Sequence, residues 1–504
     1  MLGETTHDDL GYVPREKPDV DPKDDRAPAW NGPGARGGGT LTTRTGEQEI
    51  VASSVEGRTF RARGTMGPVV PGDLVVLRTG TGVLAVGQLL AKNTDDGVMV
   101  GTGAILGALD PDGRVVLGPV TPFVDGSVEG ASREVWGALE KSRSADMEVG
   151  SSRAGRALLA SSAFNRHTFL CGQSGSGKSY AMGVLLEQLL IDTDVPLLIL
   201  DPNGDFVGLG NSLATADSPD RERLESADVR VFRPRAAEGG RLLRVRFTDL
   251  SIEAKAAVLQ LDPLTDRMEY NVLLQLGDEL RTRPPEHVLR TLTQSSDRDK
   301  HHLAQHIENL GVLGWEVWAR GSEAVLEGLE PQPRAAVIDL GGFEHPREPL
   351  VVAMAVLDSL WARREQRRPV LLVIDEAHNI CSSDPADPLA RATTARLIQI
   401  ANEGRKYGIW LLLCSQRPSR IHESVLVQCD NLALMRMNSP GDLGQMESAF
   451  GFVPVEMLRT APGFKKGECL MAGTFAPAPT FVQVRSRRTR EGGADVQVPR
   501  RADP

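Results

Sequence analysis

The sequence has few aromatic residues, few cysteines and no long apolar run. Aromatic residues make up 5% of the 504 positions, and the five cysteines are scattered and never spaced as CxxC. This cysteine usage argues against a zinc site and predicts a reducing, cytoplasmic setting. The longest apolar runs, such as VPLLIL and IWLLLC, are far shorter than the roughly 18–20 residues that span a bilayer. The N-terminus has no apolar core of a signal peptide, so we expect no direct membrane insertion.

An excess of positive charge is also missing. The chain has 57 Lys and Arg against 67 Asp and Glu, which gives a net charge of −10 and a pI of about 5.5. No global basic field therefore indicates binding to nucleic acid. A ring or channel can still be basic inside and acidic outside, so DNA is not excluded. Hydrophobic content of 40% and charged content of 25% are ordinary for a globular protein.

Composition changes divide the chain into segments. Residues 1–44, rich in Asp, Pro and Gly, predict a disordered arm. Residues 45–122 contain short strand-like runs between glycine-bearing turns and predict a small β-barrel. Residues 123–165 predict a connector with one helix near 132–141. Residues 166–483 alternate apolar strands with helices, which predicts an α/β domain built on a mostly parallel sheet, with a helical insertion at about 250–330. Residues 484–504 predict a mobile, arginine-bearing tail.

The stretch GQSGSGKS at residues 172–179 satisfies the phosphate-loop pattern G-x-x-x-x-G-K-[ST]. It follows the apolar run HTFLC and precedes a helix, the context that separates this motif from a chance glycine-rich turn. Backbone N–H groups and the helix N-terminus would surround the phosphates of ATP. Lys178 would pair with the β- and γ-phosphates, and Ser179 would ligate Mg²⁺. The predicted nucleotide-binding residues are Gly172, Gln173, Ser174, Gly175, Ser176, Gly177, Lys178, Ser179 and Tyr180.

Two acidic residues end the apolar run PVLLVIDEAH at residues 369–378. An acid at a strand end beside a phosphate loop can hold Mg²⁺, and a second acid can orient and polarise the attacking water. We assign Asp375 to the metal and Glu376 to the water. Asp339, which ends the run AAVID, is a weaker rival for the metal because no glutamate follows it; a capping role fits it better. Residues 375–378 also spell the DEAH box of two-domain helicases, a superficial likeness because the chain has no second such domain.

Two further strand-like runs carry polar residues at their ends. LLILD ends in Asp201, and IWLLLCS is followed by Gln416. In a parallel sheet these ends share one edge with the phosphate loop, so Asp201 is expected at that edge, with a plain strand-to-turn exit as the alternative. Gln416 could sense the γ-phosphate or orient water. Arg405 and Lys406 precede the second strand, too far from their own nucleotide to act in cis. Arg405 could reach a neighbouring subunit's nucleotide, as a trans-acting arginine does; an ordinary solvated turn is the alternative.

These motifs together resemble the HerA group of hexameric ATPases, in the HerA–FtsK branch of RecA-like DNA translocases. The resemblance covers roughly residues 145–475, and its specific motifs are ILDPNGDF, LLVIDEAHN and EGRKYGIWLLLCSQRPS. It implies a RecA-like P-loop ATPase domain with a helical insertion, preceded by a small N-terminal β-barrel. It also implies Asp201 as an auxiliary acid, Arg405 as the trans-acting arginine, Gln416 as the sensor, and Arg166 as a basic residue near the subunit interface. The chain departs from the usual DPxGEY form with Asn203, Asp205 and Phe206, which are conservative changes.

The resemblance implies an ATP-driven homohexameric DNA translocase or helicase that takes DNA, expected to be double-stranded, through a central pore. In this family such motors work with a nuclease of the NurA type in DNA end processing, or with effectors in antiphage defence. An assembly or scaffold ATPase and a conjugation- or secretion-type ATPase remain alternatives, whereas a small-molecule kinase leaves the barrel unexplained. Loops near 208–222 and 294–301 are candidate DNA grips.

Overall fold

The computed structural model describes residues 50–64, 67–213, 217–235, 240–276, 285–321 and 323–492. The arm expected at residues 1–44 lies outside the described residues. Among the described helices, none has the length and apolar character needed to cross a membrane.

Short strands at the start of the described chain form a closed barrel. They alternate buried and exposed side chains, as the glycine-separated runs predict. The sheet order is β2-β1-β7-β3-β4-β5-β6, and an additional pairing between β2 and β5 closes it. The last barrel strand lies beyond residue 122, inside the segment expected to be a connector, because β7 pairs with both β1 and β3. The strands are β1 Val51–Ser54, β2 Thr59–Arg63, β3 Leu74–Arg78, β4 Leu84–Asp95, β5 Val98–Leu109, β6 Val115–Leu117 and β7 Phe123–Gly130.

The rest of the chain is built around one large mixed sheet, in the order β13-β12-β14-β11-β15-β16-β10-β17-β18-β19-β8-β9. The strands from β13 to β17 in this order are parallel, and the pairings from β17 to β9 are antiparallel. This confirms the predicted α/β fold with a preceding barrel. The strands are β8 Met147–Ser152, β9 Gly155–Leu159, β10 His167–Cys171, β11 Leu197–Asp201, β12 Val229–Arg233, β13 Arg241–Leu242, β14 Ala335–Asp339, β15 Val370–Ile374, β16 Ile409–Ser415, β17 Cys429–Met435, β18 Glu468–Gly473 and β19 Thr480–Val484.

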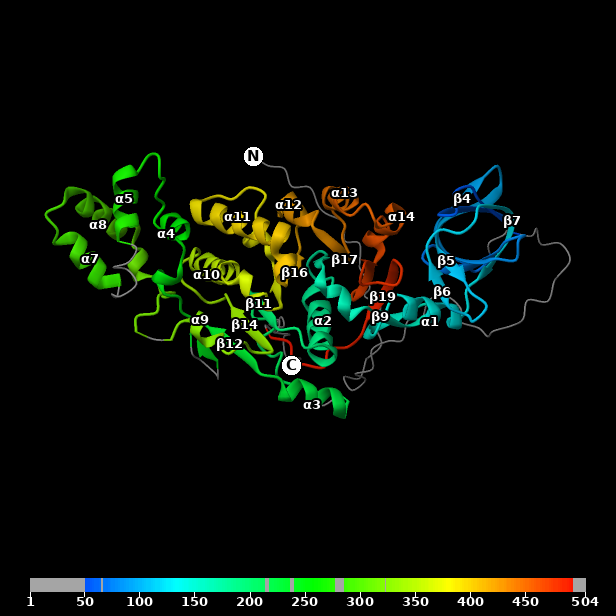
Figure 1. Ribbon diagram of the computed structural model, residues 1–504, viewed down its shortest axis with the longest axis horizontal. Helices are drawn as coiled ribbons and strands as arrows, with labels where there is room; N and C mark the ends of the chain where they lie inside the picture. Colours follow the sequence, from blue (N-terminus) through cyan, green and yellow to red (C-terminus); the bar gives the residue numbers. More distant parts are fainter. Residues whose placement is uncertain are drawn as a thin grey trace, which may run out of the picture. The chain divides into compact units, whose positions relative to one another are not determined.

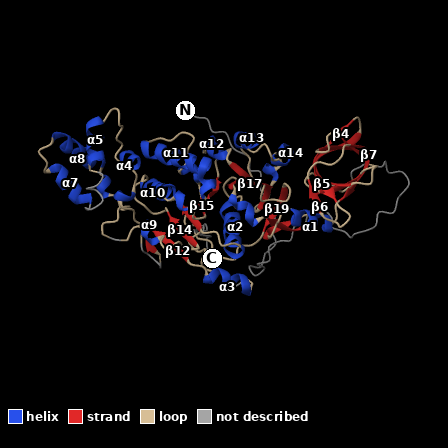
Figure 2. Cartoon of the chain, in the orientation of Figure 1, coloured by secondary structure: helices blue, strands red, loops and turns tan. Residues whose placement is uncertain are grey.

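Between β13 and β14 the described chain is helical, as the sequence predicts for the insertion. Helix α4 contacts α5, and α8 contacts both α5 and α7 (Figure 1). Figure 2 shows this insertion as helices, in contrast to the strands of the barrel. The helices of the chain are α1 Arg133–Ser142, α2 Lys178–Asp192, α3 Ser218–Ser226, α4 Ile252–Val258, α5 Arg267–Gln275, α7 Pro285–Thr293, α8 Arg298–Leu310, α9 Val325–Gly328, α10 Glu348–Ala362, α11 Pro388–Glu403, α12 Glu423–Leu426, α13 Pro440–Ala449 and α14 Val455–Leu458.

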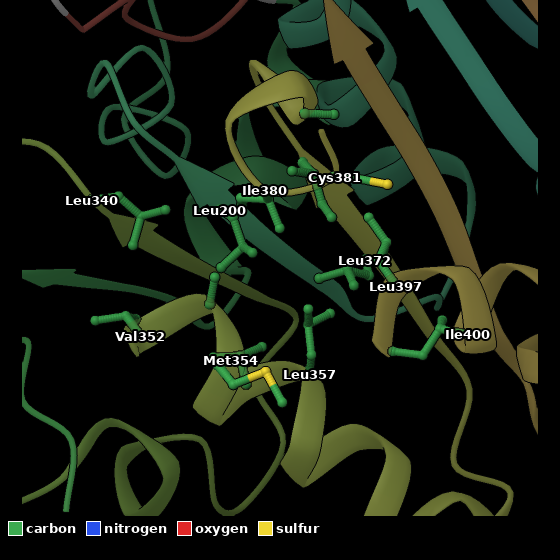
Figure 3. Packing of buried hydrophobic residues seen from close by; sticks show 14 of the residues in the cluster. Leu200, Leu340, Val352, Met354, Leu357, Leu372, Ile380, Cys381, Leu397 and Ile400 are labelled. Carbon is green, nitrogen blue, oxygen red and sulfur yellow. The ribbon is translucent and has the colours of Figure 1, made fainter. Parts of the chain in front are cut away.

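Both faces of the parallel strands are buried, which explains why these strands are apolar throughout rather than alternating. Leu200 and Leu372 face one core with α10 and α11 (Figure 3). The neighbouring residues Ile199 and Val373 face a second core with α2. Burying each of these aliphatic side chains stabilises the fold by about 1.5–3 kcal/mol. The packed strands therefore hold the polar residues at their ends in place.

The expectation of a mobile tail is wrong for residues 485–492. This segment follows β19 and lies against α2, where the backbone N–H groups of Arg488 and Thr489 donate to Glu187 at 2.9 and 2.8 Å. Arg487 is buried. The side chains of Arg485 and Arg487 lie against the buried carboxylate of Glu187, and Arg488 pairs with Asp220. The sequence does not reveal these partners. Residues 493–504 lie outside the described residues.

Candidate active site

The phosphate-loop motif connects the buried strand β10 to helix α2. Gly175 and Gly177 have φ angles of 73° and 99°, a left-handed conformation that side chains resist. A Cβ on Gly172 would lie 2.8 Å from the Cβ of Met435, so this position also requires glycine. Lys178 opens α2 and is 6% exposed. The loop therefore has the backbone shape and the helix N-terminus that favour a phosphate.

Strand register brings the predicted catalytic residues to the same edge as this loop. Cys171 pairs with Ser415 between β10 and β16, and Ile374 pairs with Leu413 between β16 and β15. The residues that follow these pairs are Gly172, Gln416 and Asp375. One strand, β16, separates the phosphate-loop strand from the strand that carries the acids.

Asp375 is 1% exposed and its Oδ1 atom has no hydrogen-bond partner. Its Oδ2 atom accepts a long hydrogen bond of 3.5 Å from the side-chain amide of Asn203. Burial, followed by the nearby charge of Glu376, raises the pKa of Asp375 to about 6, although a hydrogen bond from Cys414 opposes the shift. A buried carboxylate with an unused oxygen is well suited to a cation.

Glu376 lies beside Asp375 with a backbone φ of 44°. This left-handed conformation costs energy in a residue other than glycine and is often found at functional sites. Its carboxylate accepts a hydrogen bond from the side-chain amide of Gln416, and the backbone N–H of Gln416 lies 3.4 Å from Oε2. The Nδ1 atom of His378 lies 3.3 Å from the same Oε2 and 3.1 Å from Ser415 Oγ. Gln416 and His378 thus orient the carboxylate predicted to act on water.

Asp201 ends β11 and is completely buried. Its carboxylate accepts hydrogen bonds from the backbone N–H groups of Asp205 at 3.0 Å and Phe206 at 2.8 Å. Burial first, and then the charge of Asp375, raises the pKa of Asp201 to about 7, while the two backbone hydrogen bonds lower it. Both oxygens are therefore used to hold the turn that carries Asn203.

Asp339 lies away from this group. Its strand, β14, is separated from β10 by β11, β15 and β16. Its carboxylate accepts from the backbone N–H of Gly341 at 3.0 Å and lies 3.5 Å from Arg233 Nε. This local pairing fits the capping role better than a metal site shared with the phosphate loop.

The predicted arginines lie at the opposite edge of the sheet. Arg405 belongs to the short 3-10 turn Gly404–Tyr407 and Arg166 directly precedes β10. Both face Asp430 in β17, with Oδ2 at 2.5 Å from Arg405 Nη1 and 3.8 Å from Arg166 Nη1. The whole of β16, seven residues long, lies between Arg405 and Gln416, and at roughly 3.3 Å per residue the strand alone spans more than about 20 Å. Neither arginine can serve the phosphate loop of its own chain.

Several residues at the site were missed from the sequence. His378, Asn203 and Cys414 contact the predicted acids. Arg436 directly follows β17, and its carbonyl accepts from the backbone N–H of Gln173 at 2.8 Å. Placement after a strand of the parallel sheet was the available signal for Asn203 and Arg436. Asp430 is the second residue of β17, and only its spatial neighbours identify it.

The candidate DNA grips near 208–222 and 294–301 include both loop and helical residues. Residues 208–213 lie against the C-terminal segment, where Leu213 N–H donates to the carbonyl of Arg488 at 2.6 Å. Residues 214–216 lie outside the described residues, and 218–222 belong to α3. Of 294–301, the last four residues begin α8. Their contact with DNA stays a prediction.

Known proteins are similar to a large part of this chain. Residues 148–356 match the family model described as the central domain of helicase HerA. The chain is 24% identical over 346 residues to a DNA double-strand break repair helicase HerA of Sulfurisphaera tokodaii, covering 66% of this chain and 67% of that protein. It is 22% identical over 379 residues to the protein of the same name from Pyrococcus furiosus, with the same coverage of 66% and 67%.

Solved structures are more distant. VirB4 of Thermoanaerobacter pseudethanolicus is 16% identical with a TM-score of 0.46, covering 68% of this chain and 97% of that chain. The bacterial conjugative coupling protein TrwB is 14% identical with a TM-score of 0.44, covering 72% of this chain and 93% of that chain.

Proposed function

We propose that this P-loop ATPase, which is similar to the HerA helicases, is an ATP-driven DNA translocase that works as a homohexameric ring. Each nucleotide would lie between neighbouring subunits. One subunit would supply the phosphate loop and the acids, and the next would supply Arg405 and Arg166.

In this proposal the residues divide the chemistry of hydrolysis. Lys178 and the backbone of residues 172–179 bind the phosphates. Tyr180, the next residue on α2, completes the set of nucleotide-binding residues. Glu376 takes the proton of the attacking water, and Gln416 holds Glu376 and reports on the γ-phosphate. Mg²⁺, held by Ser179 and Asp375, would neutralise charge on the phosphates. The unpartnered Oδ1 of Asp375 and Oγ of Ser176 fit a polar ligand here, and oxygen donors are those that Mg²⁺ prefers.

The position of the two arginines is the observation that supports a ring. They lie about one strand length, roughly 20 Å, from the phosphate loop of their own chain, yet they converge on one half-exposed carboxylate, Asp430. A head-to-tail interface would bring this edge against the phosphate loop of the next copy, and repeating it closes a ring.

DNA is proposed as the substrate because the relatives named above are DNA repair helicases. A NurA-type nuclease or a defence effector is the proposed partner. A cytoplasmic location, expected from the cysteines, belongs to the same proposal; all five thiols are buried and unpaired.

The test is the effect of DNA on ATP hydrolysis by the purified full chain. A translocase should hydrolyse ATP several-fold faster with double-stranded DNA, and its DNA affinity should fall steeply with salt because phosphate contacts release counterions. Single-stranded DNA and heparin serve as controls for strandedness and for unspecific charge.

Equal ATPase rates with and without DNA, together with a stable co-purifying protein, would contradict translocation. That result would favour the alternative, an assembly or conjugation-type ATPase whose output is a partner protein.

A further inference from the structure

A buried carboxylate on the phosphate-loop helix takes no part in the site described above. Glu187 of α2 is completely buried. Its oxygens accept from the backbone N–H groups of Arg488 at 2.9 Å and Thr489 at 2.8 Å, and from Thr489 Oγ1 at 2.6 Å. Arg485 Nη1 lies 3.2 Å away. Because an unpaired buried carboxylate is very costly, Glu187 anchors the segment 485–492, which we call the C-terminal strap.

Arg487 is buried within the strap, with its side chain 1% exposed. Its backbone N–H donates to the hydroxyl of Tyr180 at 2.8 Å, and its Nε lies 3.6 Å from Glu187 Oε1. The guanidinium lies on Gly183 of α2, where an added Cβ would be 2.6 Å from Nε and Cζ. The absence of a side chain at Gly183 thus makes room for Arg487.

The same guanidinium reaches the loop that follows β11. Arg487 Nη1 donates to the carbonyl of Asp205 at 3.5 Å, and the guanidinium carbon lies 5.9 Å from the centre of the Phe206 ring. The strap adds a second donor, because the backbone N–H of Gly492 donates to the same carbonyl at 3.1 Å.

This loop connects directly to the site. The backbone N–H groups of Asp205 and Phe206 hold the carboxylate of Asp201, and Asn203 of the same turn reaches Asp375. Asp205 therefore binds the auxiliary acid through its N–H and the strap through its carbonyl.

We propose that Arg487 is a positioning residue for ATP hydrolysis: it clamps the Asp201–Phe206 turn to the phosphate-loop helix and so fixes the turn that carries Asn203 against Asp375. The inference rests on the assignment of ATP hydrolysis and not on DNA translocation. Arg487 touches neither nucleotide nor metal in this account, and it acts through the backbone of Asp205.

The test compares four variants of the full chain by kcat, KM for ATP and thermal unfolding. Arg487→Met removes the clamp, and Arg490→Met is the matched control, because Arg490 is an exposed arginine of the same strap. Arg487→Lys keeps a donor that can reach Asp205. Gly183→Ala places a methyl group where the guanidinium lies, and alanine is a better helix former than glycine.

We expect Arg487→Met to lower kcat roughly tenfold, since small misplacements of catalytic groups have effects of this size or larger, with little change in KM. Rates are expressed per nucleotide-binding chain, so that unfolded protein does not lower the measured kcat. Arg487→Lys should recover part of kcat, Gly183→Ala should lower it, and Arg490→Met should match the wild type.

Equal kcat for Arg487→Met and Arg490→Met would overturn the inference. If Arg487→Met does not fold, Gly183→Ala decides: wild-type kcat in this variant overturns the clamp, and a lowered kcat with cooperative unfolding supports it. A wild-type chain that does not hydrolyse ATP would instead overturn the assignment of ATP hydrolysis, and the inference with it.

Discussion

The two edges of the central sheet hold their charges in different ways. Where the strands end, Asp201 and Asp375 are 0% and 1% exposed, and burial raises the pKa of both. Where the strands begin, the side chains of Arg405, Arg166 and Asp430 are 36%, 46% and 40% exposed. The acids at the first edge are shielded from solvent, whereas the charged side chains at the second edge are accessible to a neighbouring subunit. Both groups belong to one sheet but to different strands: the acids lie at the ends of β11 and β15, whereas Arg166, Arg405 and Asp430 lie at the starts of β10, β16 and β17.

The largest expected effect is at the buried edge. Glu376→Gln removes the proposed base while leaving Lys178 and the loop intact. ATP hydrolysis should fall roughly 10²- to 10⁴-fold, the usual contribution of general-base catalysis. Single-turnover hydrolysis and binding of a fluorescent ATP analogue separate the two steps, and binding should persist.

Glu365→Gln is the matched control, because Glu365 is an exposed glutamate on the turn before β15. If Glu376→Gln hydrolyses ATP as fast as this control, Glu376 is not the base.

A second prediction concerns stability at the open edge. His167 is completely buried there; its Nε2 lies 3.0 Å from the carbonyl of Ala401 and its Nδ1 accepts from the N–H of Leu411 at 3.0 Å. Burial, set against the Ala401 hydrogen bond, lowers the pKa of His167 from 6.5 to about 4. Folding therefore favours the neutral ring. This preference stabilises the folded chain fully above pH 6.5, and the stabilisation is lost as the pH falls toward 4. The free energy of unfolding should thereby fall by about 3 kcal/mol.

His167→Asn should reduce this loss, measured as the free energy of unfolding in urea between pH 7 and pH 4. The buried acids contribute with the opposite sign, because the raised pKa values of Asp201 and Asp375 favour folding as the pH falls. The difference between variant and wild type isolates the histidine. His302→Asn, at an exposed histidine of α8, is the control, and an equal pH dependence in both variants would refute the prediction.

The smallest stability effect is expected at Asp430. Asp430→Asn removes the negative charge that Arg405 and Arg166 share, but the exposed pair is worth only about 0–1 kcal/mol. The urea midpoint should barely move, whereas ATPase should fall several-fold because Arg405 loses its orientation. Glu447→Asn breaks a comparable exposed pair with Arg459 and should change neither. A large loss of stability with normal ATPase would show that Asp430 has a purely structural role.

The sequence was most informative where local pattern decides structure. The phosphate loop, the apolar parallel strands and the acids at their ends follow from spacing and from the rule that parallel strands share an edge. Gln416 and Glu376 lie together because their strands are neighbours, as this rule predicts. The roles of these residues remain predictions.

Contacts between distant segments could not be read from the sequence. Glu187 lies within VLLEQLL and resembles an exposed acid, and the arginines at 485–490 resemble a solvated tail. Only the folded chain brings them together, about 300 residues apart. The pairing of Arg405 with Asp430 and the place of β7 between β1 and β3 in the barrel were missed for the same reason.

In the proposed ring the two edges of the sheet serve one reaction across neighbouring subunits. Mixing two inactive variants tests this: Lys178→Ala removes the phosphate-loop lysine, and Arg405→Ala removes the trans-acting arginine. In mixed rings about a quarter of the interfaces join an intact loop to an intact Arg405.

We expect ATPase activity to reappear on mixing, with a maximum near equal proportions, whereas neither variant alone should regain activity. If no mixing ratio restores hydrolysis although mixed rings are shown to form, Arg405 does not act on a neighbouring subunit's nucleotide.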